Sequence, residues 1–488
     1  MNRKESPSWW VSLIPVIMLV GLMALVITFF GADALLGGSQ VALITSMGVA
    51  IAIAMIGYGC PWEKLGDAIN DNIKSIGTAI LILLMIGTIG GSWMISGIVP
   101  TFICYGLKII SPSIFLFAVC LICALVSLVT GSSWTTVATI GVALIAIGSA
   151  QGYSPAWTAG AIISGAYFGD KISPLSDTTV LASSCAEIPL FTHIRYMMIT
   201  TVPSFVIALV IFLVVSLCHA SQAACEADQM ANVLSSKFNI TPWVFVVPVL
   251  TGIMIARKMP ALLTLLLASL MAGILALIAQ PGIVAEIGGG STLTFESAFK
   301  GTVTSFFGDT AIDCGNAGMN DLIATHGMNG MLPTIFLIIC AASFGGVLKG
   351  SGMIQSITER FTRSVRSRTG LVASTVGTGV FCNMTMGDQY LSIILTSSLF
   401  KKLYADLGYE GRLLSRSTED SATVTSVLIP WNSCGMTQST VLHVPTVEYL
   451  PYCFFNILSP CMSILVAALG YKIIFRKQAL ATERYEEL

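Results

Sequence analysis

Long apolar runs separated by short polar stretches dominate the pattern of the chain. Most runs are about 20 residues long, which is the length that an α-helix needs to cross a bilayer. They predict membrane-spanning helices over residues 9–30, 41–58, 76–94, 196–218, 243–256, 260–279, 331–348 and 446–472. Two shorter stretches, 97–110 and 352–368, suit helices that lie in the membrane interface. The pattern therefore predicts an all-α polytopic membrane protein with about ten crossings.

Two pairs of apolar arms enclose polar tips. The arms 113–129 and 135–148 flank the tip TGSSWTT at 130–136, and the segment 370–403 carries the tip NMTMGDQ at 383–389. The arms of the first pair are short for a crossing, and their join is small and polar. We therefore expect two re-entrant hairpins, with tips at mid-membrane depth.

Polar residues also interrupt two helices. The stretch 155–186 is broken at 169–179, where two carboxylates, a lysine and Pro174 occur together. Proline has no amide hydrogen and disfavours helix in the residues before it, so the helix should break here. A second interruption is expected at 415–423, within 411–432. Irregular backbone survives in a bilayer only where protein or a water-filled cavity satisfies it, so both breaks should face a polar interior.

The two halves of the chain repeat one another. Gly97 recurs as Gly352, shifted by 255 positions. Asp177 and Asp420 differ by 243, so we interpret them as counterparts and expect the second broken helix to be shorter on its leading side. A common order of such matches is typical of an internal repeat. The predicted units are a first repeat at 1–218, an external linker at 219–241, a second repeat at 242–475 and a cytoplasmic tail at 476–488.

An odd number of crossings in each half would invert the second repeat relative to the first. With ten crossings and both termini in the cytoplasm, only three basic residues fall on the outer side, namely Lys108, Lys237 and Lys300. All other lysines and arginines fall on the inner side, as the positive-inside rule requires. The charges therefore favour two inverted repeats with both termini cytoplasmic.

Composition narrows the class of protein further. Hydrophobic residues make up 55% of the chain and charged residues only 10%, against about 25% charged residues in soluble domains. The net charge of -1 gives no reason to expect a nucleic-acid partner. Most of the 13 cysteines stand alone in apolar runs without metal-ligand spacing, and no phosphate-binding loop occurs. The sequence indicates no enzyme, no cofactor and no ATP-driven transport.

Five carboxylates fall inside the apolar stretches, namely Asp170, Asp177, Asp388, Glu419 and Asp420. Each would cost about 2.5–3.5 kcal/mol at the centre of a helix facing lipid, so these side chains should face a polar interior and bind ions or protons. We expect Asp177 and Asp420 to be the foremost of them. Two have simpler interpretations, because Asp177 could cap the helix that follows and Asp170 could lie at the inner interface.

A small hard cation such as sodium prefers carboxylate, hydroxyl and carbonyl oxygens. The expected supporting ligands are Ser132, Ser133, Ser173, Ser176, Thr178, Thr385, Ser417, Thr418, Ser421 and Asn432. Our hypothesis places sodium at Asp177, Ser176 and Asp420. A carboxylate that holds either sodium or a proton would couple the two ions. Alternatively, helix N-termini at the tips could bind an organic acid, although Arg416 is the one basic residue close to the second break.

Residues 165–179 (GAYFGDKISPLSDTT) resemble the signature of the NhaC family of sodium/proton antiporters. Residues 190–197 (LFTHIRYM) and 419–432 (EDSATVTSVLIPWN) are similar to further segments of that family. The resemblance covers nearly the whole chain. It implies a multi-pass carrier of the bacterial inner (plasma) membrane, built from two inverted repeats with hairpins and broken helices, that exchanges sodium for protons. One departure is Val180, where the resemblance implies an asparagine.

The same family includes a malate–proton/lactate–sodium antiporter, so the alternative is a sodium- or proton-coupled exchanger of small carboxylates. The expected partners are sodium ions, protons and the lipid bilayer, with a small carboxylate under the alternative and no nucleic acid. A homodimer stays open as an assembly state.

Overall fold

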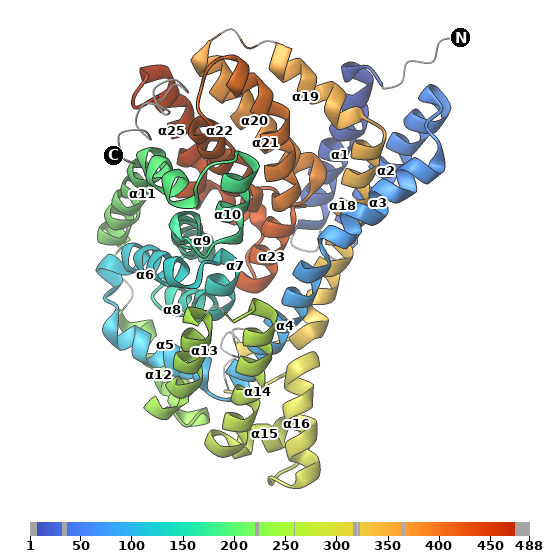
Figure 1. Cartoon of the computed structure of the whole chain (residues 1–488). Coiled ribbons are helices and arrows are strands. Elements are labelled where there is room, and N and C mark those ends of the chain that lie inside the picture. Colours follow the sequence, from blue (N-terminus) through green and yellow to red (C-terminus); the bar gives the residue numbers. More distant parts are fainter. Residues whose placement is uncertain are drawn as a thin grey trace.

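The computed structural model describes residues 7–31, 37–219, 224–257, 259–315, 320, 323–363, 365 and 367–473. Within these residues the chain is helical, without a β-strand, and a single bridge joins Thr310 to Thr325 (Figure 1). Eight helices are long and apolar enough to cross a membrane, or up to 10 if each of two bent pairs counts as one span. The prediction of an all-α polytopic membrane protein is confirmed. The predicted tail at 476–488 lies outside the described residues.

The first helices match the predicted spans closely. The elements are α1 (Trp9–Phe30), α2 (Gly38–Ala52) with a π-turn at Ile53–Gly57, α3 (Trp62–Ser75), α4 (Gly77–Ile95) and α5 (Ile98–Ile109). Helix α5 is apolar but too short to span, in line with the helix expected at 97–110. Helix α3 is the polar connection between the second and third spans, and it packs along α18 in the second half.

The first hairpin and the first broken helix follow. They comprise α6 (Phe115–Thr130), α7 (Ser133–Thr136), a π-turn at Val137–Gly141, α8 (Val142–Ala150), α9 (Pro155–Ile172), α10 (Asp177–Cys185) and α11 (Leu190–His219). The helix breaks between Ile172 and Asp177, around Pro174 as predicted. The hairpin arms are longer than expected, because Pro112–Thr130 and Ser133–Ala150 are each long enough to cross. Their re-entrant course stays a prediction.

The segment between the halves contains more helix than the sequence pattern predicts. The elements are α12 (Ala224–Lys237), a 3-10 turn at Pro242–Phe245, α13 (Val246–Ala256), α14 (Ala261–Ala279), α15 (Pro281–Ile287) and α16 (Phe295–Phe307). The prediction of a loop over 280–329 is therefore wrong for its first half. Helix α16 starts at a capping box, in which Thr294 and Ser297 bind each other's backbone amides at 3.2 and 2.9 Å.

The second half closes the fold. Its elements are a 3-10 turn at Gly327–Met331, α18 (Leu332–Gly350), α19 (Met353–Arg363), α20 (Arg368–Met386), α21 (Gln389–Asp406), α22 (Gly411–Thr418), a π-turn at Glu419–Thr423, a 3-10 turn at Ser426–Leu428, α23 (Ser433–Leu442), α24 (Thr446–Tyr449), a 3-10 turn at Leu450–Tyr452 and α25 (Phe454–Leu469). Segments Thr446–Tyr452 and Phe454–Leu469 meet at a bend of 57°. The last predicted span is therefore bent.

The second break lies later than the sequence pattern predicts. Residues 415–423 stay helical and pass through the π-turn, whereas the extended interruption is at 429–432, after Leu428 and before α23. Pro430 is in this interruption, and proline disfavours helix in the residue before it. The break thus follows the same rule as the first one, at a different place from the one predicted.

A constant shift of 256 relates the hairpins and broken helices of the two halves. Both tips end a helix with a left-handed glycine, Gly131 at φ 66° and Gly387 at φ 64°. Both breaks end at a capping side chain, Ser176 before α10 and Asn432 before α23. At this shift Asp177 corresponds to Ser433, so our pairing of Asp177 with Asp420 at a shift of 243 is wrong. At this shift the tips and the breaks match without the expected deletion, and the inverted repeat stays a prediction.

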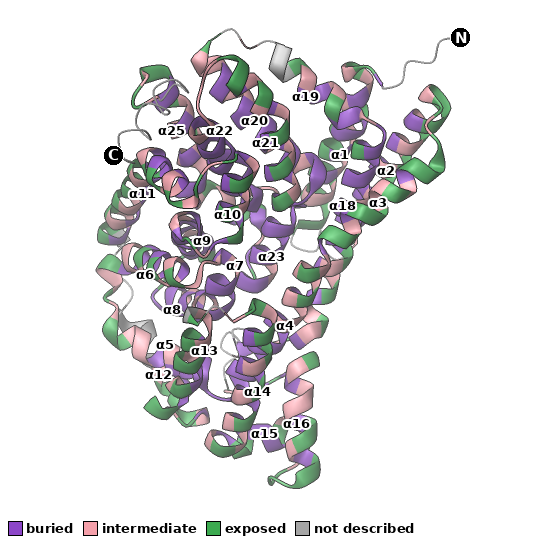
Figure 2. Cartoon of the chain, viewed as in Figure 1, coloured by how far each residue is buried: buried purple, intermediate pink, exposed green. Residues whose placement is uncertain are grey.

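Helix α9 runs through the centre of the molecule and is almost wholly buried (Figure 2). It packs against α6 at a distance that only glycine permits, since a Cβ at Gly165 or Gly169 would lie 2.1 or 2.2 Å from an α6 carbonyl oxygen. Small residues allow such close approach between membrane helices. In Figure 1, α19 lies at the opposite end of the molecule from α12 and α16. Helix α19, predicted to be cytoplasmic, and Lys237 on α12, predicted to be external, therefore lie at opposite ends; which end faces the cytoplasm stays a prediction.

Candidate ion-binding site

A cavity of about 820 Å³ joins both hairpin tips and the first break. Its wall comes from the first tip, the start of α10, the second tip and the start of α23, together with residues of α4 and α14. Seven of the predicted site residues line it, namely Asp170, Asp177, Asp388, Ser132, Ser133, Ser176 and Thr178. Glu419, Asp420 and the other six predicted ligands do not. The structure thus gathers half of the predicted site around one cavity.

Asp170 ties the first tip to the first broken helix. It lies at the end of α9, is 6% exposed, and its Oδ2 accepts hydrogen bonds from the amide of Ser133 at 3.2 Å and the hydroxyl of Ser133 at 2.8 Å. Ser132 caps α7 by accepting a hydrogen bond from the amide of Thr135 at 3.2 Å. The N-terminus of a helix carries partial positive charge, which favours an anionic carboxylate here. Asp170 is therefore a fixed carboxylate inside the wall of the cavity.

Asp177 is the first residue of α10, and its side chain is exposed. Ser176 is the helix cap, because its hydroxyl accepts from the amide of Thr179 at 3.5 Å. The interpretation of Asp177 as the cap is therefore wrong, and its carboxylate stays available at the wall of the cavity. The hydroxyls of Ser176 and Thr178 lie 3.0 Å apart. Val180, where the resemblance implies asparagine, also lines the cavity and offers no oxygen ligand.

Asp388 lies in the second tip, and both of its carboxylate oxygens accept hydrogen bonds from other residues. Its Oδ1 accepts from the amide of Leu391 at 3.0 Å, which caps α21, and its Oδ2 accepts from the hydroxyl of Ser433 at 3.3 Å. The amide of Ser433 donates to the carbonyl of Gly387 at 2.8 Å. Asp388 therefore fastens the second tip to α23 while it lines the cavity.

Asp420 lies apart from the cavity in a buried ion pair. Lys171 Nζ donates to Asp420 Oδ1 and, at 2.9 Å, to Ser459 Oγ, while Ser459 Oγ donates to the same Oδ1 at 3.0 Å. The Lys171 and Asp420 side chains are both fully buried. This pair joins the first break to the second broken helix. The sequence pattern shows Lys171 inside a break, but it does not show which carboxylate the lysine meets.

Glu419, next to Asp420, is fully buried and poorly hydrogen-bonded. Its Oε1 lies 3.5 Å from the hydroxyls of Thr178 and Thr179, and its Oε2 has no hydrogen-bond partner in the described part of the chain. Thr179 has a shorter alternative acceptor, the carbonyl of Lys171 at 3.0 Å. Glu419 therefore lies behind the cavity wall and touches it through Thr178.

The remaining predicted ligands serve the fold. Ser173, Thr385, Ser417 and Ser421 donate to the backbone carbonyls of Leu128, Phe381, Leu413 and Ser417 at 2.7–2.9 Å. Thr418 accepts from Ser397 at 3.4 Å. Asn432 caps α23 and donates to the carbonyl of Asn383 at 3.1 Å. Of these contacts, those of Thr418 and Asn432 join the second broken helix to the second hairpin.

Comparison with known proteins identifies the family of this chain. The sequence matches the family described as "Na+/H+ antiporter family" over residues 6–188 and 165–471. The chain belongs to this Na+/H+ antiporter family. It is 36% identical to the Na(+)/H(+) antiporter NhaC of Bacillus subtilis over 86% of this chain and 90% of that protein. It is 37% identical to the Na(+)/H(+) antiporter NhaC of Alkalihalophilus pseudofirmus over 87% of this chain and 88% of that protein.

The same comparison also finds a relative whose name states a different transported substrate. The Malate-2H(+)/Na(+)-lactate antiporter of Bacillus subtilis is 33% identical over 90% of this chain and 91% of that protein. Family membership and the apolar helices identify a multi-pass transporter of the plasma membrane. The resemblance to the NhaC family, expected from the three motifs, is confirmed.

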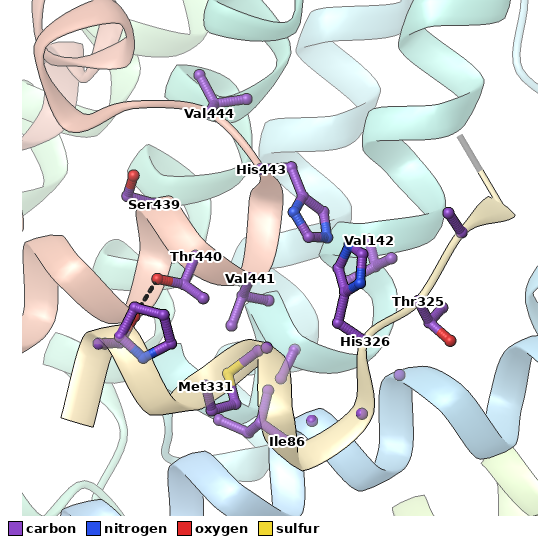
Figure 3. A pocket seen from close by; sticks show the side chains of 18 of the residues that line it. Ile86, Val142, Thr325, His326, Met331, Ser439, Thr440, Val441, His443 and Val444 are labelled. Atoms are coloured by element: carbon purple, nitrogen blue, oxygen red, sulfur yellow. Dashed lines mark hydrogen bonds between the residues drawn. The ribbon is translucent and has the colours of Figure 1, made fainter. Parts of the chain in front are cut away.

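This antiporter has a second, smaller pocket of about 370 Å³ between α4, the 3-10 turn before α18 and the end of α23. Figure 3 shows His326 and His443 pointing toward one another across it. His326 Nδ1 lies 2.6 Å from Asp309 in an exposed pair. The hydroxyls of Thr334 on α18 and Thr440 on α23 lie 2.5 Å apart at its wall (Figure 3). In contrast to the large cavity, no carboxylate lines this pocket in the described residues.

The described residues contain no group of three His, Cys, Asp or Glu side chains arranged to hold a metal ion. A cation in the large cavity would therefore be held by one carboxylate together with hydroxyl and carbonyl oxygens, as sodium accepts. Asp170 with the first tip, or Asp177 with Ser176 and Thr178, offers such a set. Asp420 offers none, because Lys171 occupies its Oδ1.

Proposed function

We propose that the protein is a secondary antiporter that exchanges sodium ions for protons across the plasma membrane. The observation that carries this proposal is the charge of the cavity wall. Asp170, Asp177 and Asp388 line the cavity, and no Lys, Arg or His does so in the described part of the chain. Carboxylates without basic neighbours attract cations and protons, and hydroxyls complete the oxygen ligands of a hard cation.

Asp170 is the proposed centre of the sodium site. The tip fixes its Oδ2 through Ser133, so its carboxylate is oriented before an ion arrives. Asp177, Ser176 and Thr178 supply further oxygens along the same wall. We leave Asp420 out of the sodium site, because its charge is already compensated by Lys171.

The cavity reaches the side that the charge pattern predicts to be cytoplasmic. Its lining includes Ser75 and Thr78 at the join of α3 and α4, and residues 259–261 before α14. These turns are flanked by Lys74 and Arg257, which the positive-inside rule places in the cytoplasm. We propose that the structure is an inward-facing state, in which sodium enters from the cytoplasm.

The alternative is an exchanger of small carboxylates, as the name of the malate/lactate relative states for that protein. An organic anion would need a basic side chain or free amides in the cavity wall. Arg416 is fully buried, stacks on the ring of Tyr196 with its guanidinium carbon 4.8 Å from the ring centroid, and does not line the cavity. The amide of Ser133 is taken by Asp170. The wall therefore favours cations over organic anions.

Proteoliposomes test the proposal directly. A pH gradient is imposed with a pH-sensitive dye inside, and sodium chloride or choline chloride is added outside. Sodium alone should collapse the gradient, and choline should not. If collapse requires malate or lactate in addition to sodium, the carboxylate exchanger is correct and the sodium/proton exchange is refuted.

A further inference from the structure

We propose that the exchanged proton binds to Glu419, while sodium binds at the cavity wall around Asp170. The two ions would then occupy different carboxylates and compete through charge, without sharing an oxygen ligand. This inference rests on the proposed sodium/proton exchange and assigns its second site. It is argued from the burial of Glu419, the absence of an ion pair to it among the described residues, and its contact with Thr178.

Glu419 is the buried carboxylate that gains most from a proton. It is 0% exposed, makes no ion pair among the described residues, and leaves Oε2 without a hydrogen-bond partner. The charge of Lys171 offsets part of the cost of desolvating the ionised carboxylate, and protonation removes the cost that is left. Asp420 is different, because protonating it would leave Lys171 buried without its counter-ion. Of these two adjacent acids, the proton therefore belongs on Glu419.

A short chain of hydroxyls connects Glu419 to the cavity. The Ser176 hydroxyl lines the cavity and lies 3.0 Å from that of Thr178, which lies 3.5 Å from Glu419 Oε1. Hydroxyls both donate and accept, so they can pass a proton along such a chain. Sodium cannot follow, because Glu419 is fully buried behind the wall and absent from the cavity lining. The geometry thus separates a site for a proton from a site for a larger cation.

Charge couples the two sites. Sodium at the wall favours the ionised form of a nearby carboxylate and so releases the proton from Glu419. By reciprocity, a proton on Glu419 weakens sodium binding by the same factor. Such coupling between distinct sites is finite, typically about 5–150-fold. Competition for one shared carboxylate would have no such limit.

The substitution Glu419→Gln separates the two ions experimentally. Glutamine is nearly the same size as glutamate, but its side chain has no ionised form and so cannot bind the exchanged proton. In proteoliposomes, E419Q should abolish sodium-driven pH change. It should retain exchange of radioactive ²²Na⁺ for unlabelled sodium within about twofold of the wild type, since a substitution away from the sodium site costs little. E448Q, the same change at an exposed position of α24, should retain both activities.

Three outcomes would overturn the inference. E419Q could still couple sodium to protons, or a folded E419Q could lose sodium–sodium exchange as well. The third is measured on the unaltered protein. The sodium concentration for half-maximal exchange should rise as pH falls and then level off within about 150-fold. A continued tenfold rise for each pH unit would indicate one shared carboxylate. If the unaltered protein moves no protons in response to sodium, the proposed function itself fails.

Discussion

The two broken helices share one backbone frame and carry different chemistry. Each follows a hairpin tip with a left-handed glycine, and each ends at a side chain that caps the next short helix. The first places an exposed carboxylate, Asp177, directly after its cap. The second places Ser433 at the equivalent position and carries its acids in a π-turn instead, one of them paired with Lys171.

Under the proposed mechanism, this difference divides one task between the two breaks. The first break presents carboxylates to the cavity, where we propose that sodium binds. The second break buries its acids, so that under the same proposal only charge and protons act on them. A lysine from the first break compensates an acid of the second, so the two breaks also form one packed unit.

The largest expected effect is at Asp170. Asp170→Asn keeps an oxygen that can accept from Ser133 but removes the charge that attracts sodium. We expect sodium-driven pH change and sodium–sodium exchange both to be abolished. The dye assay and ²²Na⁺ exchange measure this in the same vesicles. Asp67→Asn, the same substitution at an exposed position of α3, is the matched control. Exchange by D170N at the rate of D67N would refute the sodium site.

The next effect is on stability and concerns the pair of Lys171 and Asp420. Asp420→Asn leaves Lys171 fully buried without a counter-ion, which should destabilise the fold by about 3–5 kcal/mol. Thermal unfolding in detergent, followed by the loss of monodisperse protein on size exclusion, measures the change. The double variant K171M/D420L removes both charges and should recover most of the lost stability. If the double variant is no more stable than D420N, the buried charges are not the cause.

The sequence predicts the parts of this fold that depend on local pattern. Spans such as 9–30 follow from hydropathy, and the first break follows from Pro174. The hydropathy pattern does not predict helix α16, because it is short and mixes apolar with polar residues, although the capping box at Thr294 marks its start. The pattern places the second break too early, because hydroxyls and acids at 415–423 suggest unwinding. Ser417 and Ser421 instead bond to carbonyls one turn back, which a helix permits.

The candidate site residues show the same limit of prediction from local sequence pattern. The sequence pattern marks Asp170 and Asp388 as acids at membrane depth but ranks them below Asp420, which does not line the cavity as they do. The partner of Asp420 lies 249 positions away, and no local pattern encodes a contact over that separation. The constant shift of 256 could have been found from Gly131 and Gly387, whose left-handed turns need glycine. That alignment would have paired Asp177 with Ser433.

Asp177 gives a smaller transport effect than Asp170. Its carboxylate is exposed at the cavity wall and, in the described residues, no tip holds it in place. We expect Asp177→Asn to raise the sodium concentration for half-maximal exchange about tenfold, equivalent to about 1.4 kcal/mol, with the maximal rate nearly unchanged. Initial rates over a series of sodium concentrations measure both quantities. A D177N variant without any exchange would place the main sodium ligand at Asp177 instead of Asp170.

Ser433→Ala tests the equivalent position of the second half, and its effect should be the smallest. The variant removes the hydroxyl that donates to Asp388 at 3.3 Å, while the amide of Leu391 still holds the carboxylate. Losing one such hydrogen bond should cost about 1 kcal/mol of stability. Sodium affinity should stay unchanged, because Ser433 fastens α23 to the tip and is not a proposed ligand. A tenfold loss of sodium affinity in S433A, matching that expected of D177N, would mean that both breaks bind the ion. The division between an ion-binding break and a buried charged break would then be wrong.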